Sequence, residues 1–236
     1  MRINESFSIE QTINPRVNNN HNSLTWQIFP PQNKLSKDTK TSYLSSPKYF
    51  EIKELVNKYD LSNKNISISP ILTFAINEKT EFEKEFGTIK SSSMQDIITN
   101  PLSQDYDFDL NKKINEMRKT CRNNKNYAEN IAKQMKAKKI GNCCDISAVT
   151  QNILNKKNTD YKGDLLYASI LSDNVLCNHI AVLVRQKSET DKTPQKDALV
   201  LDNWLGGVFK YENWIKILKK IYNSKEVSTY IDYSQQ

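Results

Sequence analysis

The sequence predicts an α+β protein, with helices gathered in its first two thirds and strands gathered in its last third. Between about residues 109 and 154, apolar residues recur every three or four positions, as on one face of a helix. From Gly163 onward the pattern changes to short aliphatic runs separated by polar turns, as in strands. The 236 residues are enough for one domain with a substantial core.

The chain divides at about residue 40. Residues 1–40 are rich in Asn, Ser, Thr, Pro and Lys and contain one apolar island, Leu24–Phe29. We expect a flexible leader that could carry an export signal, because such a composition cannot bury a core. It has no apolar segment typical of a cleaved signal peptide. Residues 41–236 are expected to form a single α+β domain with its core at about 109–233 and an accessory lobe at 41–108.

The accessory lobe contains one clear helix signal. Residues 49–59 carry apolar residues near helical spacing, which predicts a short helix. The run 71–76 is aliphatic and is interpreted as a strand that Pro70 restricts to a sheet edge or to a strand start. Residues 94–98 suit a helical turn, and residues 105–109 suit a loop.

In the core region that begins at about residue 109, three helices are predicted before the first strand. Asp109 is a suitable cap for the first, and Asn142 caps the third, with Asp145 three residues later in the reciprocal capping pattern. Their apolar stripes are Leu110, Ile114, Met117 and Cys121 in the first, Ala128, Ile131 and Met135 in the second, and Ile146, Val149, Ile153 and Leu154 in the third.

The last third is predicted to contain four strands and one more helix. Gly206-Gly207 suggests a turn, and the segment after it is amphipathic. The expected strands are 165–171, 179–184, 198–202 and 227–233, and the expected helix is Tyr211–Tyr222.

Composition and charge exclude several function classes. The net charge is +7, but Lys and Arg are scattered over solvated faces, so we expect no nucleic-acid partner. A basic surface would equally steer the chain toward an acidic protein. No stretch is long enough to cross a bilayer. The four cysteines contain no CxxC pair, so we expect no metal or other cofactor and a reducing, cytosolic working compartment.

Three residues form a candidate nucleophilic site: Cys143, His179 and Asp202. Cys143 would begin a helix, where unpaired backbone N–H groups favour a thiolate and can also bind a developing oxyanion. His179 lies at the head of an apolar strand and Asp202 at the end of the next, so they come level if those strands are antiparallel neighbours. A base that deprotonates the thiol and an acid that orients the base are the parts of a catalytic triad. The other histidine, His21, lies in the leader and is not expected to take part in catalysis.

Each member also has a structural interpretation. Cys143 could be a small buried hydrophobe, and Cys144 is expected to point inward about 100° around the helix. His179 could be a core imidazole, Asp202 a turn residue that caps nearby backbone, and Trp204 a core aromatic rather than a wall of the site. The conjunction of all three triad members favours the catalytic interpretation.

These motifs resemble the papain-like and transglutaminase-like Cys-His-Asp superfamily, and most closely its bacterial effector glutamine deamidases and related cysteine proteases. The residues that carry the resemblance are Gly141-Asn142-Cys143, Asn178-His179 and Leu201-Asp202-Asn203-Trp204, within about residues 130–220. The resemblance implies a catalytic cysteine at a helix N-terminus packed on a small antiparallel sheet. Cys144 and Asn203 depart from it, because Gly and Pro are common at those positions.

By that resemblance, Cys143 is the nucleophile, His179 the general base and acid, and Asp202 the orienting carboxylate. The implied reaction is deamidation of a glutamine in a host protein by a monomeric effector. The resemblance also implies export through a specialised bacterial system without a cleaved signal peptide, followed by action in the host cytosol. A cysteine protease or a transglutaminase with the same triad remains an alternative, as does a non-enzymatic protein-interaction module.

Overall fold

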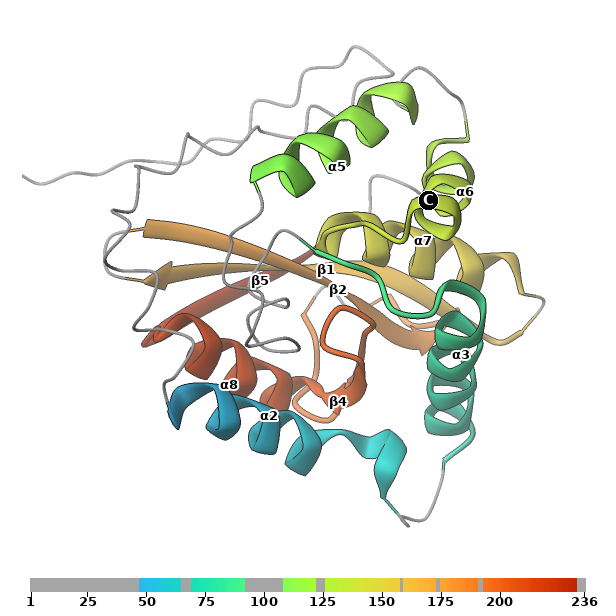
Figure 1. Cartoon of the computed structure of the whole chain (residues 1–236). Helices are drawn as coiled ribbons and strands as arrows, with labels where there is room; N and C mark the ends of the chain where they lie inside the picture. Colours follow the sequence, from blue (N-terminus) through green and yellow to red (C-terminus); the bar gives the residue numbers. More distant parts are fainter. Residues whose placement is uncertain are drawn as a thin grey trace, which may run out of the picture. The chain divides into compact units, whose positions relative to one another are not determined.

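The computed structural model describes residues 47–64, 69–91, 108–121, 126–157, 159–172, 175–190 and 193–232. Within these ranges the chain is mixed α+β, with six α-helices and one five-stranded antiparallel sheet (Figure 1). The predicted α+β class is confirmed at this level. The leader, residues 1–40, lies outside the described residues.

The helices are α2 (Pro47–Tyr59), α3 (Pro70–Phe86), α5 (Phe108–Cys121), α6 (Tyr127–Lys138), α7 (Cys143–Lys156) and α8 (Tyr211–Tyr222), with a short 3-10 helix, η2 (Leu61–Asn63). The strands are β1 (Tyr161–Ser172), β2 (Val175–Gln186), β3 (Leu199–Asp202), β4 (Gly207–Lys210) and β5 (Glu226–Asp232).

The sheet has the order β4-β3-β2-β1-β5, and each neighbouring pair is antiparallel. Strands β1 and β2 are the longest, with Ala168 opposite His179 near the middle of their pairing. Strand β3 pairs with β2 only over the short stretch in which Leu201 lies opposite Val182. The sheet therefore places the chain after β3 next to the first half of β2, where His179 lies.

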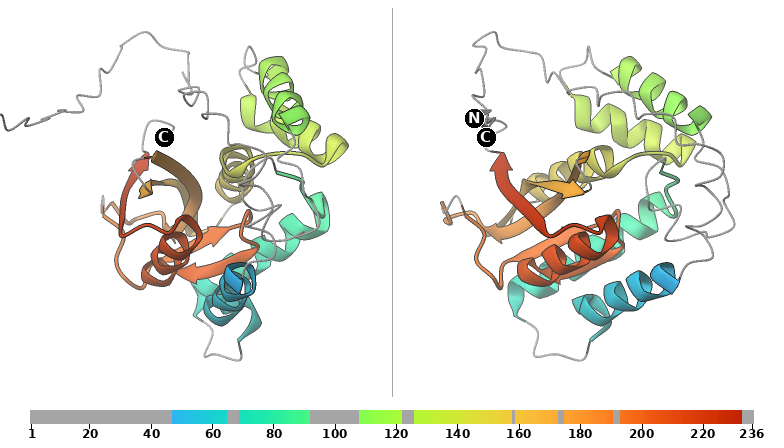
Figure 2. Two further views of the ribbon diagram at one scale, coloured as in Figure 1. Left: turned by 60° about the vertical axis from the view of Figure 1, so that its left-hand side comes forward. Right: turned by 90° about the vertical axis from the view of Figure 1, so that its left-hand side faces the viewer.

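The two faces of the sheet are covered by different helices. Helix α8 lies on the face that carries His179, because the rings of Trp214 and His179 are 5.9 Å apart. Helix α7 covers the opposite face, where Leu154 packs beside Gly163 and Val182. Figure 2 shows α8 and α3 on opposite sides of strands β3 and β4. The site therefore forms where the N-terminus of α7 meets the α8 face.

Gly163 lies where α7 packs most closely on the sheet. A Cβ atom there would be 2.7 Å from Val182 Cγ1 and 3.2 Å from Leu154 Cδ2. Val182 is buried and β-branched, so it cannot turn aside at low cost. We expect Gly163→Ala to lower the free energy of unfolding by about 1–3 kcal/mol, measured by urea denaturation.

Gly141→Ala is the matched control for this substitution. A Cβ atom at Gly141 would meet only the flexible side chain of Met135, at 3.5 Å. Its urea midpoint should stay close to that of the wild type. If the two alanine variants were equally stable, the close packing of α7 on Gly163 would not limit stability.

The predicted strand at 71–76 is wrong, because these residues belong to helix α3. Ser69 is the N-cap, and its side chain accepts a hydrogen bond from the backbone N–H of Leu72. Pro70 is the first helical residue, a position where its missing N–H costs nothing. The Ser-Pro pair therefore begins a helix, and the aliphatic run after it supplies the buried residues Leu72 and Ala75.

The other elements agree with the sequence to within a few residues, with two exceptions. Strand β2 begins at Val175, so His179 is its fifth residue and not its head. Strand β4 is not among the predicted strands, because it has only four residues and its first residue, Gly207, belongs to the glycine pair that suggests a turn. Residues 94–98 and 105–107 lie outside the described residues, whereas 108 and 109 already belong to α5.

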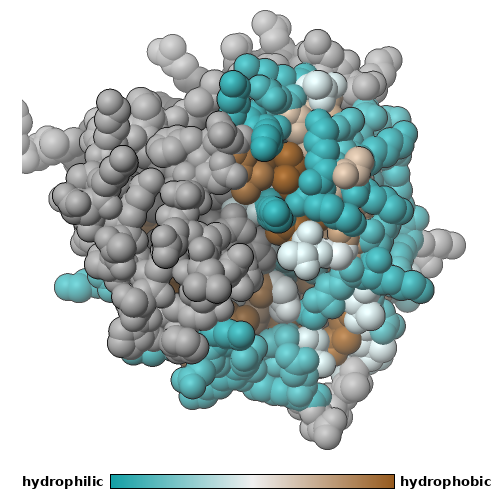
Figure 3. Space-filling model, viewed as in Figure 1, coloured by the Kyte–Doolittle hydropathy of each residue, from teal (hydrophilic) through white to brown (hydrophobic). Residues whose placement is uncertain are grey.

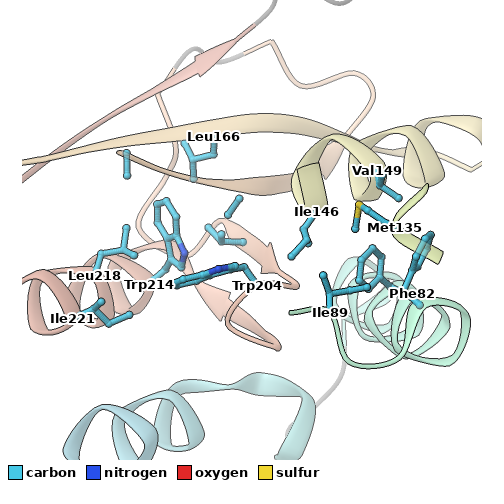
Figure 4. Close-up of a cluster of buried hydrophobic side chains, with 14 of the residues drawn as sticks. Phe82, Ile89, Met135, Ile146, Val149, Leu166, Trp204, Trp214, Leu218 and Ile221 are labelled. Atoms are coloured by element: carbon cyan, nitrogen blue, oxygen red, sulfur yellow. The ribbon is translucent and has the colours of Figure 1, made fainter. Parts of the chain in front are cut away.

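One hydrophobic cluster joins these elements. Phe82 and Ile89 from the first half of the chain belong to the same cluster as Ile146, Trp204 and the buried residues of the sheet and α8. Figure 4 shows Ile146 between the tryptophan side of this cluster and its Phe82 side. The surface seen in Figure 3 is mostly hydrophilic where it is coloured, in keeping with a mean hydropathy of −0.69.

Candidate functional site

Cys143 is the first residue of α7, as predicted, and the turn around it is held by several hydrogen bonds. Asn142 is the N-cap, and its backbone N–H donates to Asp145 Oδ2 at 2.9 Å. This is the Asp145 half of the predicted capping box. Just before the cap, Gly141 donates its N–H to the carbonyl of Lys90 at 3.0 Å. The residues that follow α3 therefore help to fix where α7 begins.

Gly141 does not act as a turn residue of the left-handed kind. Its φ is not positive, and it is buried beside Met135. The chain therefore enters α7 with ordinary backbone angles at this glycine.

His179 and Asp202 form a buried pair. The ring Nε2 of His179 lies 2.7 Å from Asp202 Oδ2, and the two side chains are 0% and 1% exposed. Strand geometry explains the contact, since Asp202 lies on the same face of the sheet as Val200, which belongs to the α8 side with His179. Two of the three predicted triad members are thus brought together by a direct hydrogen bond.

Asp202 also caps the turn that follows β3, as its structural interpretation predicted. Its Oδ1 atom accepts hydrogen bonds from the backbone N–H groups of Trp204 and Leu205, at 3.1 and 3.0 Å. Its Oδ2 atom accepts from His179 and from the indole Nε1 of Trp214, the latter at 2.8 Å. A carboxylate held by this many donors has one orientation, and the imidazole that it binds is fixed with it.

Two indole rings enclose the imidazole of His179. The ring of Trp204 lies 4.7 Å from it and that of Trp214 lies 5.9 Å from it, both tilted. Both tryptophans are buried. The two indole rings therefore shield the imidazole from solvent. Trp204 is therefore both a core residue and a wall of the site.

The second ring nitrogen of His179, Nδ1, is the one that Asp202 leaves open, and Cys143 lies near enough to the ring to influence it. Nδ1 is buried and makes no hydrogen bond of full geometry to a described residue. Cys143 nevertheless acts on the ring through a hydrogen-bond interaction and through its charge. We interpret this as a loose contact, one that shifts proton affinity but misses the geometry of a complete hydrogen bond. Catalytic hydrogen bonds are often long before substrate binds.

The protonated form of His179 is strongly favoured. Burial opposes the charge, but the Asp202 carboxylate outweighs burial and, with Cys143, raises the pKa of His179 to about 10. An ordinary histidine has a pKa near 6.5. His179 is therefore an imidazolium at neutral pH in the free protein, as a partner for a thiolate should be.

The two neighbouring cysteines have different surroundings. Cys143 is half-buried and lies near His179, whereas Cys144 accepts a hydrogen bond from Arg118 Nη2 at 2.6 Å. Burial, followed by the charge of Asp145, raises the pKa of the Cys144 thiol well above its ordinary value. A thiol that stays protonated is a poor nucleophile. The geometry therefore favours Cys143 over Cys144 as the reactive sulfur.

Three residues that sequence reasoning did not place at the site belong to it. Ser91 accepts a hydrogen bond from Trp204 Nε1 at 3.3 Å and donates one to Asn142 Oδ1 at 2.9 Å. Trp214 binds Asp202, and Arg118 binds the first turn of α7. Of these, only Trp214 gave a sequence signal, as a large aromatic on a predicted amphipathic helix that follows the Asp202 turn.

Asn142 also lies at the site, where Ser91 Oγ donates a hydrogen bond to its side-chain oxygen.

Comparison with known proteins adds no family. No family model matches the chain, and neither the curated proteins nor the solved structures include a match. Among the described residues, no group of histidine, cysteine and carboxylate side chains is arranged to hold a metal ion. No helix in the same ranges is long and apolar enough to span a membrane.

Proposed function

We propose that this protein is a thiol-dependent acyl-transfer enzyme in which Cys143 is the nucleophile, His179 the general base and acid, and Asp202 the orienting carboxylate. The observation that carries the proposal is the buried His179–Asp202 pair, 2.7 Å apart, with a cysteine at a helix N-terminus near enough to raise the pKa of His179. A core histidine could be satisfied by Asp202 alone. The nearby sulfur is what favours catalysis.

The first half of the reaction follows from these positions. The Cys143 thiolate attacks the amide carbon of the substrate, and the oxygen becomes an oxyanion near the N–H groups that begin α7. Those N–H groups have no partner within the helix and favour negative charge. The His179 imidazolium then gives its proton to the leaving nitrogen. The C–N bond breaks, ammonia leaves, and a thioester remains on Cys143.

The second half uses the neutral imidazole that has just been formed. His179 takes a proton from water, and the resulting hydroxide attacks the thioester carbon. When the C–S bond breaks, the products are a carboxylic acid and the Cys143 sulfur beside a protonated His179. Asp202 keeps the ring in one orientation through both steps, and it stabilises the imidazolium each time it forms.

Within this class we propose a glutamine side chain of a host protein as the substrate, by resemblance to bacterial effector deamidases. The same resemblance suggests a papain-like arrangement of the core, export by a specialised bacterial system and action in the host cytosol. Proteolysis would use the same steps with a peptide amine leaving, and transglutamination would replace water with an amine. These two reactions are outcomes of the test that follows.

Treated host-cell lysate analysed by mass spectrometry tests the proposal. The wild type should convert one or a few glutamines to glutamate, a gain of about 1 Da with intact chains, because ammonia is exchanged for water. Cys143→Ala should produce none of these changes, since it lacks the nucleophile. Cys144→Ala is the matched control and should retain the activity.

The alternatives give different products in the same experiment. New chain ends would identify a protease, and cross-linked or amine-modified glutamines would identify a transglutaminase. Equal modification by the wild type and Cys143→Ala, or no modification by either in lysates of several cell types, would contradict the enzyme assignment and favour a protein-interaction module.

A further inference from the structure

Arg118 and Asp145 form an ion pair at the first turn of α7. Arg118, from α5, donates through Nε to Asp145 Oδ1 at 2.8 Å and through Nη2 to Asp145 Oδ2 at 2.6 Å. The Asp145 side chain is 1% exposed and that of Arg118 is 16% exposed. Parallel two-point contact of this kind fixes both partners in position. The pair therefore ties α5 to the residues that present the two cysteines.

Asp145 poses an electrostatic problem for a catalytic thiolate. Its carboxylate lies two residues from Cys143, in the same helical turn, and it is buried where screening by water is weak. A nearby negative charge disfavours a thiolate, whereas the helix N-terminus favours one. The cap that starts the helix would thus weaken the nucleophile that the helix presents, unless a cation balanced it.

We infer that Arg118 is a positioning residue for Cys143, which it serves by neutralising Asp145 and by holding the first turn of α7 in place. Arg118 does this without touching His179 or Asp202 in any described contact, so it acts through Asp145 and Cys144. Its additional hydrogen bond to Cys144 keeps the second sulfur beside the guanidinium group. This inference rests on the proposed role of Cys143 as nucleophile.

Several titratable groups surround the Cys143 sulfur and share in setting its behaviour. Some of these groups act on the Cys143 sulfur directly, and the others act on it through a neighbouring titratable group. They are His179 on β2, Asp202 on β3 through His179, Cys144 and Asp145 on α7, Arg118 on α5, and, around Cys144, Tyr127 on α6 and Tyr167 on β1.

The test is the pH at which Cys143 becomes reactive toward iodoacetamide, followed by peptide mass spectrometry from pH 4 to 10. Arg118→Gln leaves Asp145 unbalanced, so the midpoint should rise by about 1–2 pH units. Asp145→Asn leaves Arg118 unbalanced, so the midpoint should fall. The double variant Arg118→Gln/Asp145→Asn removes both charges and should return the midpoint to within about half a unit of the wild type.

A purely structural role gives a different pattern. If the pair only held α5 on α7, all three variants would shift the midpoint in the same direction, and the double variant would not recover. That result, or an unchanged midpoint in both single variants, would overturn the inference. Arg118→Lys keeps the positive charge but loses the two-point contact with Asp145. The pH midpoint for alkylation of Cys143 should therefore stay near that of the wild type, even if the protein is less stable.

The wild-type profile separates this inference from the proposed function. If Cys143 in the wild type reacted no faster at low pH than a free thiol, the nucleophile itself would be in doubt. If the wild-type midpoint were low but the charge variants did not follow the expected order, only the inference about Arg118 would fail, and the proposed role of Cys143 would stand.

Discussion

At pH 6, iodoacetamide should modify Cys143 about 10 to 100 times faster than a free thiol, and His179→Ala should remove this advantage. A free thiol with a pKa near 8.5 is less than about 1% thiolate at that pH. The start of a helix and a neighbouring imidazolium both favour a negatively charged sulfur, although a stabilised thiolate is somewhat less nucleophilic. Intact-protein mass against time gives the rate, and peptide mapping assigns it to Cys143.

Two comparisons make the alkylation result specific. Cys144→Ser should react like the wild type, because the Cys144 sulfur is bound by Arg118 and its thiol stays protonated. Cys121 is 1% exposed and should stay unmodified in the folded protein. Equal rates in the wild type and His179→Ala would mean that the imidazole does not activate the sulfur, and the acyl-transfer proposal would fail.

The helices were predictable because each buries one stripe of residues at a regular spacing. Leu110, Ile114, Met117 and Cys121 are all buried in α5, as their steps of four, three and four indicated. Helix α8 begins and ends at the predicted residues. Such periodicity is local, so a single sequence is enough to find it.

The segment 70–86 could not be assigned by the same reasoning, because its first aliphatic residues suit either a strand or a helix. The residues that decide it are Ser69 and Pro70, which cap and start α3. In a strand, Pro70 would only restrict the segment to a sheet edge or to a strand start, so the proline alone does not decide between the two. Phe82 and Phe86, buried one turn apart near the end of α3, carry the helical period that the short window missed.

The candidate site was predictable as far as it depends on chain order and strand alternation. Alternation along β2 and β3 places His179 and Asp202 on one face, and the antiparallel register brings Asp202 to the level of Ala181, two residues from His179. The contacts of Ser91 with Trp204 and of Arg118 with Asp145 cross 113 and 27 positions of the chain. They depend on how α3 and α5 pack beside α7, which no local pattern in the sequence encodes.

Asp202→Asn should lower the free energy of unfolding by a few kcal/mol near pH 6, because it leaves a buried imidazolium without its counter-charge. Asn keeps the shape of the side chain and can still accept from the Trp204 and Leu205 N–H groups. Its Nδ2 cannot accept from Trp214 Nε1, which costs a further hydrogen bond at every pH. The part of the loss that depends on pH therefore reports on the His179 charge. Urea denaturation of both proteins across pH 5.5–10.5 measures it.

The pH dependence of this loss has a definite sign. In the wild type, Asp202 raises the pKa of His179 to about 10 in the folded state, against about 6.5 unfolded. Stability from a raised pKa is fully present below about pH 6.5 and is lost as the pH rises through about 10. The gap between wild type and Asp202→Asn should thus be widest at low pH and should narrow toward pH 10. A gap that stayed constant over this range would show that Asp202 acts only as a hydrogen-bond acceptor, and that His179 is not a cation in the folded protein.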